Sequence, residues 1–192
     1  MLAAVILSGG SSSRMGSPKA LLPYHGRPFL EHLLALCKHP KIGTRRVVLG
    51  AHAEPIARAV DLDSAEIVIN DDWRNGQLSS IQAAIRSLPE GTAGLLMFLI
   101  DHPLISGSLV SGLIQHFYET RAPIVVPVYE GKRGHPVIFS AGLYGELERA
   151  PLDVGARSVV WAHDKQVSEF ATTEEGCILN LNDPRAFENV PI

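Results

Sequence analysis

Short continuous runs of apolar residues alternate along the chain with stretches in which apolar residues recur every three or four positions. The continuous runs predict buried strands at residues 2–7, 45–49, 66–69, 94–100, 124–128, 137–139 and 167–170. The periodic stretches predict helices at about residues 28–38, 55–60, 81–88 and 108–119. Strands that alternate with helices in this way predict an α/β fold with a mostly parallel sheet. Residues 94–100 form the most continuous run, which predicts a central strand buried on both faces.

The composition is that of an ordinary globular protein. Of the 192 residues, 46% are hydrophobic and 19% are charged, so we expect a single domain over residues 1–192. A net charge of −3 argues against nucleic acid or an anionic membrane as the main partner. The chain starts directly on a predicted strand and has no apolar run of membrane-spanning length, so we expect a cytoplasmic protein. Cys37 and Cys177 have no C-x-x-C partner, which predicts neither a disulfide framework nor a zinc site.

A loop of small residues directly follows the first predicted strand. The loop opens with Leu7, Ser8, Gly9, Gly10 and Ser11. Such a backbone lets N–H groups approach phosphate oxygens closely. Arg14 adds a planar guanidinium with several N–H donors, and Lys19 adds an ammonium group on a flexible side chain. The loop therefore predicts a triphosphate site. A flexible turn without a ligand is the alternative.

Two commoner glycine loops do not fit this segment. A P-loop needs Gly followed directly by Lys, whereas Ser17 and Pro18 separate Gly16 from Lys19. A dinucleotide-binding loop needs an acidic residue at the end of the next strand, and residues 50–52 there read Gly-Ala-His. The loop is therefore of another kind.

The strand at 66–69 leads through a polar loop to the start of a helix. Gly76, Gln77, Ser79 and Ser80 stand at that start. Small polar residues there leave backbone N–H donors pointing outward, which could read a base edge or hold a phosphate. The alternative is that Ser79 or Gln77 serves only its own backbone. We expect Trp73, just before this start, to be a packing anchor rather than a plate for the base.

Asp101 follows the predicted central strand. A carboxylate at the carboxyl end of such a strand faces the crevice where ligands bind in open α/β sheets. Mg²⁺ prefers one or two carboxylates together with substrate phosphates, so Asp101 is the candidate metal ligand. The alternative is that Asp101 caps the following turn.

These segments resemble a known family. The run from Leu7 to Lys19, continued by Leu-Leu-Pro at 21–23 and Gly-Arg-Pro-Phe-Leu at 26–30, resembles the signature of the molybdenum cofactor nucleotidylyltransferases, which join CTP or GTP to molybdopterin. Residues 70–80 resemble the loop with which that family contacts the base, and Asp101-His102-Pro103 resembles its metal-binding Asp-x-Pro. The resemblance implies a Rossmann-like, three-layer αβα nucleotidyltransferase fold.

The residues that the resemblance implies for binding the acceptor, molybdopterin, lie in the second half of the chain. Residues 124–128 and 137–139 flank a Gly-rich turn and predict a β-hairpin over the ligand edge of the sheet. Gly134-His135-Pro136 resembles the cytidylyltransferase branch, which implies that Arg133 or His135 meets the pterin phosphate. Asp153 to Arg157 resembles a further family segment, which implies Arg157 as a substrate contact. A solvated turn and a surface arginine are the alternatives.

The resemblance also places the second metal ligand near the end of the chain. Family members carry Asp or Asn at the positions of Asn180 and Asn182. Asn182 is our choice, and Asp183 is the alternative because a carboxylate binds magnesium more strongly than an amide.

The resemblance therefore predicts Mg²⁺-dependent transfer of a nucleoside monophosphate to the phosphate of molybdopterin, with release of pyrophosphate. Lys19 and Arg14 would offset phosphate charge, and Asp101 would hold the metal. Gly9 leaves room for a purine and favours GTP, whereas the two segments at 134–136 and 153–157 favour CTP. We give the two later segments more weight and expect CTP, with GTP as the alternative. Transfer to a sugar or polyol phosphate and a non-catalytic nucleotide-binding homologue are further alternatives. A molybdoenzyme or a chaperone is a possible partner.

Overall fold

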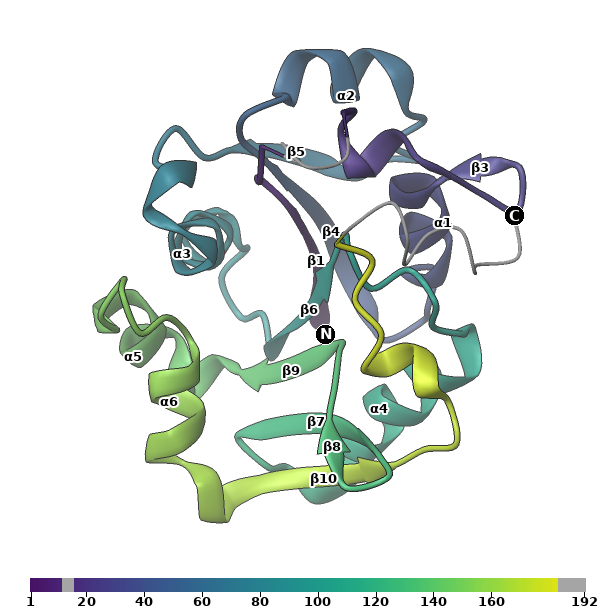
Figure 1. Ribbon diagram of the computed structural model, residues 1–192. Helices are drawn as coiled ribbons and strands as arrows, with labels where there is room; N and C mark the ends of the chain where they lie inside the picture. The colour runs from purple at the N-terminus through teal and green to yellow at the C-terminus, as the bar shows by residue number, and fades with distance from the viewer. Residues whose placement is uncertain (12–15, 183–192) are drawn as a thin grey trace.

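A mixed eight-stranded sheet runs through the middle of the computed structural model, which describes residues 1–11 and 16–182 (Figure 1). Its strands are β1 (Leu2–Ser8), β4 (Ile42–Leu49), β5 (Glu66–Ile69), β6 (Gly94–Leu99), β7 (Ile124–Tyr129), β8 (Lys132–Arg133), β9 (Val137–Ser140) and β10 (Val167–Ala171). The order is β10-β7-β9-β6-β1-β4-β5, with β8 paired to β7. β9 runs antiparallel to both of its neighbours, and β8 antiparallel to β7. The other pairs in this sheet are parallel.

Helices cover both faces of this sheet. They are α1 (Phe29–Leu36), α2 (Ala53–Ala59), α3 (Gln77–Ser87), α4 (Gly107–Thr120), α5 (Tyr144–Arg149) and α6 (Arg157–Ala162). A separate two-stranded ribbon, β2 (Pro23–Tyr24) with β3 (Arg27–Pro28), precedes α1. Figure 1 shows α3, α5 and α6 on one side and α1 and α4 on the other, which gives the three-layer αβα arrangement.

The side chains of β1 alternate between two hydrophobic cores. Leu2, Ala4 and Ile6 pack with α1, α2 and α4, whereas Val5 and Leu7 pack with α3, α5 and α6. β6 divides in the same way, because successive side chains of a strand point to opposite faces. The most buried strands thus lie in the middle of the sheet, and their carboxyl ends meet at one edge.

Most predicted elements are present with shifted boundaries. β4 begins at Ile42 instead of residue 45, and α2 begins at Ala53 instead of residue 55. α4 begins at Gly107, directly after Ser106, whose side chain caps it by accepting a 3.1 Å hydrogen bond from the Leu109 amide. Such shifts arise because packing extends an element beyond its most regular stretch.

The predicted hairpin forms, but its second strand is built into the sheet. β9 lies between β7 and β6 and pairs with both, so it is an interior strand. Only β8, in the connection between β7 and β9, lies outside this order of strands, and it pairs with β7. The hairpin therefore fixes the position of His135, which stands two residues before β9, relative to the central strand.

A helix that crosses a bilayer needs about 20 consecutive, predominantly apolar residues. Within residues 1–11 and 16–182, no helix is both long and apolar enough to cross a bilayer.

Candidate active site

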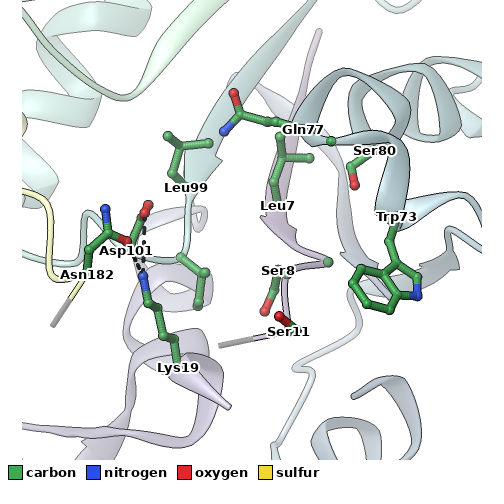
Figure 2. A pocket seen from close by; sticks show the side chains of 14 residues that line it. Leu7, Ser8, Ser11, Lys19, Trp73, Gln77, Ser80, Leu99, Asp101 and Asn182 are labelled. Carbon is green, nitrogen blue, oxygen red and sulfur yellow. Dashed lines mark hydrogen bonds and ion pairs between the residues drawn. The ribbon is translucent and has the colours of Figure 1, made fainter. Parts of the chain in front are cut away.

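A cavity of about 320 Å³ lies at the carboxyl ends of β1 and β6, beside the start of α3 (Figure 2). It is lined by Leu7, Ser8, Gly9, Gly10, Ser11, Lys19, Trp73, Gly76, Gln77, Ser80, Leu99, Ile100, Asp101 and Asn182. The residues predicted for the nucleotide and for the metal, from four separate segments, are thus brought together. Ser79 does not line the cavity, and Arg14 and Asp183 lie outside the described residues.

The tip of β1 supplies an open backbone edge. A Cβ atom built on Gly10 would meet no atom of the described residues within 4 Å, so among them this residue faces open space. The Gly9 carbonyl accepts a 3.2 Å hydrogen bond from the Ala51 amide, and the Ser11 carbonyl lies 2.8 Å from His52 Nε2. The loop is therefore held from its outer side while its inner side is left for a ligand.

The end of the cavity that lies away from Asp101 is shaped by the close approach of Gly50 to Gly9 and Trp73. A Cβ atom on Gly50 would lie 2.5 Å from the Gly9 carbonyl oxygen and 2.6 Å from Trp73 Cβ. Glycine at this position therefore lets Trp73 pack against the tips of β1 and β4, as an anchor, while its ring lines the cavity. The Arg74 guanidinium lies 4.4 Å from the centroid of that ring. Sequence reasoning missed Gly50, whose only signal is its place directly after β4.

Buried Asn70 organises the start of α3. Its side-chain amide donates 2.9 Å hydrogen bonds to Ser79 Oγ and to Ser80 Oγ. Ser79 in turn donates to the Gly76 and Asp72 carbonyls, so its hydroxyl serves the local backbone, as the alternative interpretation had it. Ser80 accepts from Asn70 and lines the cavity, which leaves its O–H available to donate to a ligand.

Lys19, Asp101 and Asn182 meet at the end of the cavity away from Trp73 (Figure 2). Lys19 Nζ lies 3.7 Å from Asp101 Oδ2 and donates a short hydrogen bond to Asn182 Oδ1. The Leu181 amide donates a 2.8 Å hydrogen bond to the Asp101 carbonyl, which fixes Asn182 beside the tip of β6. A carboxylate and an amide oxygen thus converge on one cation.

This donor pair fits a hard divalent metal. Magnesium takes oxygen ligands and is usually bound by one or two carboxylates plus substrate phosphates. Within the described part of the chain, no cluster of three His, Cys, Asp or Glu side chains could hold a metal by itself. Asp101 and Asn182 would therefore hold such an ion together with a bound polyphosphate.

A second cavity of about 410 Å³ lies next to the first, between β9, α6 and the α5–α6 connection. All three residues predicted for the acceptor line it: Arg133, His135 and Arg157. Arg133 donates hydrogen bonds of 2.6 Å to Asp164 and 2.7 Å to Glu169, so two carboxylates already neutralise its charge. Arg157 is exposed and has no ion pair within the described residues, which makes it the stronger anion-binding candidate.

His135 is held deep beside the tip of β6. Its backbone amide donates a 2.8 Å hydrogen bond to the Cys177 carbonyl, and its ring centroid lies 4.9 Å from that of His102. Burial, followed by the neighbouring His102, lowers the pKa of His135 from 6.5 to about 4. Burial also lowers the pKa of His102. Both rings are therefore neutral at pH 7.

An open backbone of small residues at the carboxyl edge of a mostly parallel sheet, with a cation, a carboxylate and an amide oxygen beside it, is typical of nucleotide-binding α/β proteins. More narrowly, the chain belongs to the family of MobA-like NTP transferase domains, whose model matches residues 4–167.

Two curated relatives carry different names. The nicotine blue oxidoreductase of Paenarthrobacter nicotinovorans is 32% identical over 147 residues, which cover 72% of this chain and 71% of that protein. The molybdenum cofactor guanylyltransferase of Xanthomonas euvesicatoria pv. vesicatoria is 36% identical over 110 residues, which cover 57% of this chain. That match spans 52% of the guanylyltransferase, about half of its length.

Solved structures share the fold over nearly the whole chain. Rv0371c from Mycobacterium tuberculosis H37Rv superposes with a TM-score of 0.84 at 26% identity, covering 97% of this chain and 95% of that one. A structure of the same mycobacterial protein in complex with manganese has a TM-score of 0.80 at 24% identity. The superposition covers 98% of this chain and 97% of that one.

Proposed function

We propose that this protein transfers a nucleoside monophosphate from a nucleoside triphosphate to the terminal phosphate of molybdopterin and releases pyrophosphate. The observation that carries the proposal is the convergence of Lys19, Asp101 and Asn182 at one end of a cavity that is bordered by the open backbone of Gly9 and Gly10. The names of guanylyltransferase relatives support the same reaction class.

The chemistry needs alignment and charge neutralisation. An oxygen of the acceptor phosphate attacks the α-phosphorus, the bond from the α-phosphorus to the bridging oxygen breaks, and pyrophosphate leaves with the electron pair. The nucleophile is already anionic, so no general base is required. Lys19 then moves from Asp101 to offset charge on the phosphates, while the amides of the Gly9–Ser11 loop hold the triphosphate.

A divalent cation, Mg²⁺ or Mn²⁺, would be held by Asp101 and Asn182. When bound, it supplies Lewis-acid stabilisation of the phosphate oxygens. The fit rests on the donor pair itself, and a neighbour of the same fold was solved as a complex with manganese.

We propose that the base lies beside Trp73 and Ser80, which line the first cavity, where the Ser80 hydroxyl can donate to it. A methyl group on Gly9 would lie 3.0 Å from Ser80 Oγ and 3.8 Å from Trp73 Cβ, so glycine lets the tip of β1 pack closely against the start of α3. The names of the guanylyltransferase relatives favour GTP. CTP, which the segments at 134–136 and 153–157 favour, is the alternative donor.

The second cavity takes the acceptor. Its apolar wall includes Val137 and Phe139, which suit a flat pterin. Arg157 forms no ion pair with another described residue, so its guanidinium is the proposed partner of the acceptor phosphate. We expect Arg157→Met to raise the KM for molybdopterin without changing the KM for the nucleotide. Arg133→Met is the comparison, and a larger acceptor effect there would reverse the two assignments.

The test is a substrate panel. Purified protein with Mg²⁺ is given each of the four ribonucleoside triphosphates with molybdopterin, or with sugar and polyol phosphates, and pyrophosphate and the dinucleotide product are measured. We expect product with molybdopterin and one nucleotide. Asp101→Asn should lower turnover by roughly 10²–10³-fold. Lys38→Met, which removes a distant surface charge, should not. Product formation by Asp101→Asn at the wild-type rate contradicts the proposal.

A second candidate function is oxidoreduction, for which a nicotinamide dinucleotide is the electron donor to test. It is favoured by the 32% identity to nicotine blue oxidoreductase over 72% of this chain. The absence of an acidic residue at the end of β4, where Gly50-Ala51-His52 stands, weighs against a dinucleotide site. Tight binding of NADH or NADPH, followed by oxidation in the presence of a quinonoid dye, would favour this candidate over nucleotidyl transfer.

A further inference from the structure

Gln77 stands at the boundary between the two cavities. It lines the nucleotide cavity together with Leu7 and Leu99, and it lines the second cavity together with His135 and Arg157. It is the only residue common to both linings among the described residues. A group that passes from a ligand in one cavity to a ligand in the other must cross beside it.

The backbone at Gln77 is held firmly. It is the first residue of α3, and Gly76 before it has a φ of +90°, a conformation that favours glycine. The next residue, Leu78, is buried in the core between α3 and the sheet. The Asn70 hydrogen bonds to Ser79 and Ser80 fix the rest of the first turn. The Gln77 side chain therefore projects from a rigid base.

The Gln77 amide is available for a ligand. The side chain is exposed, it does not cap its helix, and no hydrogen bond joins its amide to another described residue. Figure 2 shows it extending from the start of α3 past Leu7 towards Leu99, so its amide group reaches over the mouth of the nucleotide cavity.

A neutral amide suits this boundary chemically. In the proposed reaction two anionic phosphates must come within bonding distance there, and each carries unshared oxygens. The amide NH₂ group has two N–H donors, so it can donate to one oxygen of each phosphate at once. A lysine or arginine would add a positive charge between two cavities whose linings already contain Lys19 and Arg157.

We propose that Gln77 bridges the two substrates, with one N–H donated to the α-phosphate and the other to the acceptor phosphate, and so aligns the acceptor oxygen for attack. This proposal rests on the proposed function and assigns a residue to its transfer step. The bridge forms only when both sites are filled. Gln77 therefore contributes to turnover and to acceptor binding on the nucleotide-loaded protein, and little to nucleotide binding alone.

The experiment compares Gln77→Leu and Gln77→Glu with Gln115→Leu, which changes an exposed glutamine on α4 that lines neither cavity. We expect Gln77→Leu to lower kcat/KM for molybdopterin by roughly 10- to 100-fold while the Kd for the triphosphate stays within about twofold. Gln77→Glu should lose more, because it adds a negative charge between two anions. Gln115→Leu should match the wild type.

Two results would overturn the proposal. One is a Gln77→Leu variant that turns over like the wild type, and the other is a triphosphate Kd that rises in step with the loss of turnover. If the wild type forms no product with any donor, the proposed function fails, and the bridge is tested by binding instead. Molybdopterin should then bind the protein loaded with a non-hydrolysable triphosphate more weakly in Gln77→Leu than in Gln115→Leu, and equal binding refutes it.

Discussion

Replacing Lys19 with methionine should make the protein bind Mn²⁺ more tightly in the absence of nucleotide. The Lys19 ammonium lies against both proposed metal ligands, 3.7 Å from Asp101 Oδ2 and hydrogen-bonded to Asn182 Oδ1. A metal ion that binds Asp101 and Asn182 must displace the Lys19 ammonium. Methionine keeps much of the length and apolar stem of lysine and removes the competing charge.

The size of the effect follows from the geometry. At 3.7 Å and an effective dielectric constant of about 20, the Coulomb attraction between Lys19 and Asp101 is roughly 4–5 kcal/mol. Solvent reaches both side chains, which are 12% and 20% exposed, and this lowers the net value. A hydrogen bond to a charged group contributes about 1.5–3 kcal/mol. We therefore expect the Mn²⁺ affinity to rise roughly 10- to 100-fold.

The assay is titration with Mn²⁺ followed by electron paramagnetic resonance, which reports the free ion. Lys38→Met is the matched control, because it removes the same charge from a surface pair with Asp63. The double variant Lys19→Met with Asp101→Asn should lose the gain. The same variant Lys19→Met should turn over at least 100-fold more slowly, since the triphosphate loses its cation. An Mn²⁺ affinity equal to that of Lys38→Met would refute the reasoning.

Two further predictions concern stability. Gly50→Ala should destabilise the protein by about 1–3 kcal/mol, or roughly 2–12 °C in Tm, because its methyl group would overlap the Gly9 carbonyl and Trp73. Gly10→Ala, whose methyl group meets open space, should leave the Tm unchanged and weaken only nucleotide binding; equal Tm values for the two variants would contradict the packing argument. Folding stability should also fall between pH 6.5 and about pH 4, because the unfolded chain protonates His135 in that range and the folded chain does not. The difference corresponds to roughly 3 kcal/mol, and chemical denaturation of His135→Gln should show a shallower loss than the wild type.

The position of the site could be predicted from sequence for a simple physical reason. Parallel strands bring their carboxyl ends to one edge, so residues that directly follow β1 and β6 had to lie near each other. Gly10 and Asp101 were placed correctly at that edge because each follows a continuous apolar run. The start of α3 joins them because a helix that packs on the same face begins beside the same strand ends.

Other features depend on tertiary packing and carry no local signal. The insertion of β9 between β7 and β6 is a choice of strand partner, and the hairpin pattern alone is compatible with a flap over the sheet. The two carboxylates that neutralise Arg133 come from residues 164 and 169, more than 30 positions away. The choice of Asn182 needed a family resemblance, because an asparagine in a polar segment has many ordinary roles.

The role of Gly50 was missed for a related reason. A glycine after a strand indicates only a turn, and the side chain that needs its space, Trp73, lies in another connection. Similarly, Ser79 and Ser80 are equivalent in the sequence pattern. Only the Asn70 network distinguishes the hydroxyl that serves the backbone from the one that lines the cavity.

The central claim is that a triphosphate lies along Gly9–Ser11 with a divalent metal on Asp101 and Asn182. A crystal of the protein grown with Mn²⁺ and a non-hydrolysable GTP or CTP analogue, measured for anomalous scattering, tests it most directly. The account predicts an anomalous peak in contact with both side-chain oxygens and with the phosphates, and Lys19 Nζ on a phosphate oxygen. A peak elsewhere, or a nucleotide bound in the second cavity beside Arg157, would contradict it.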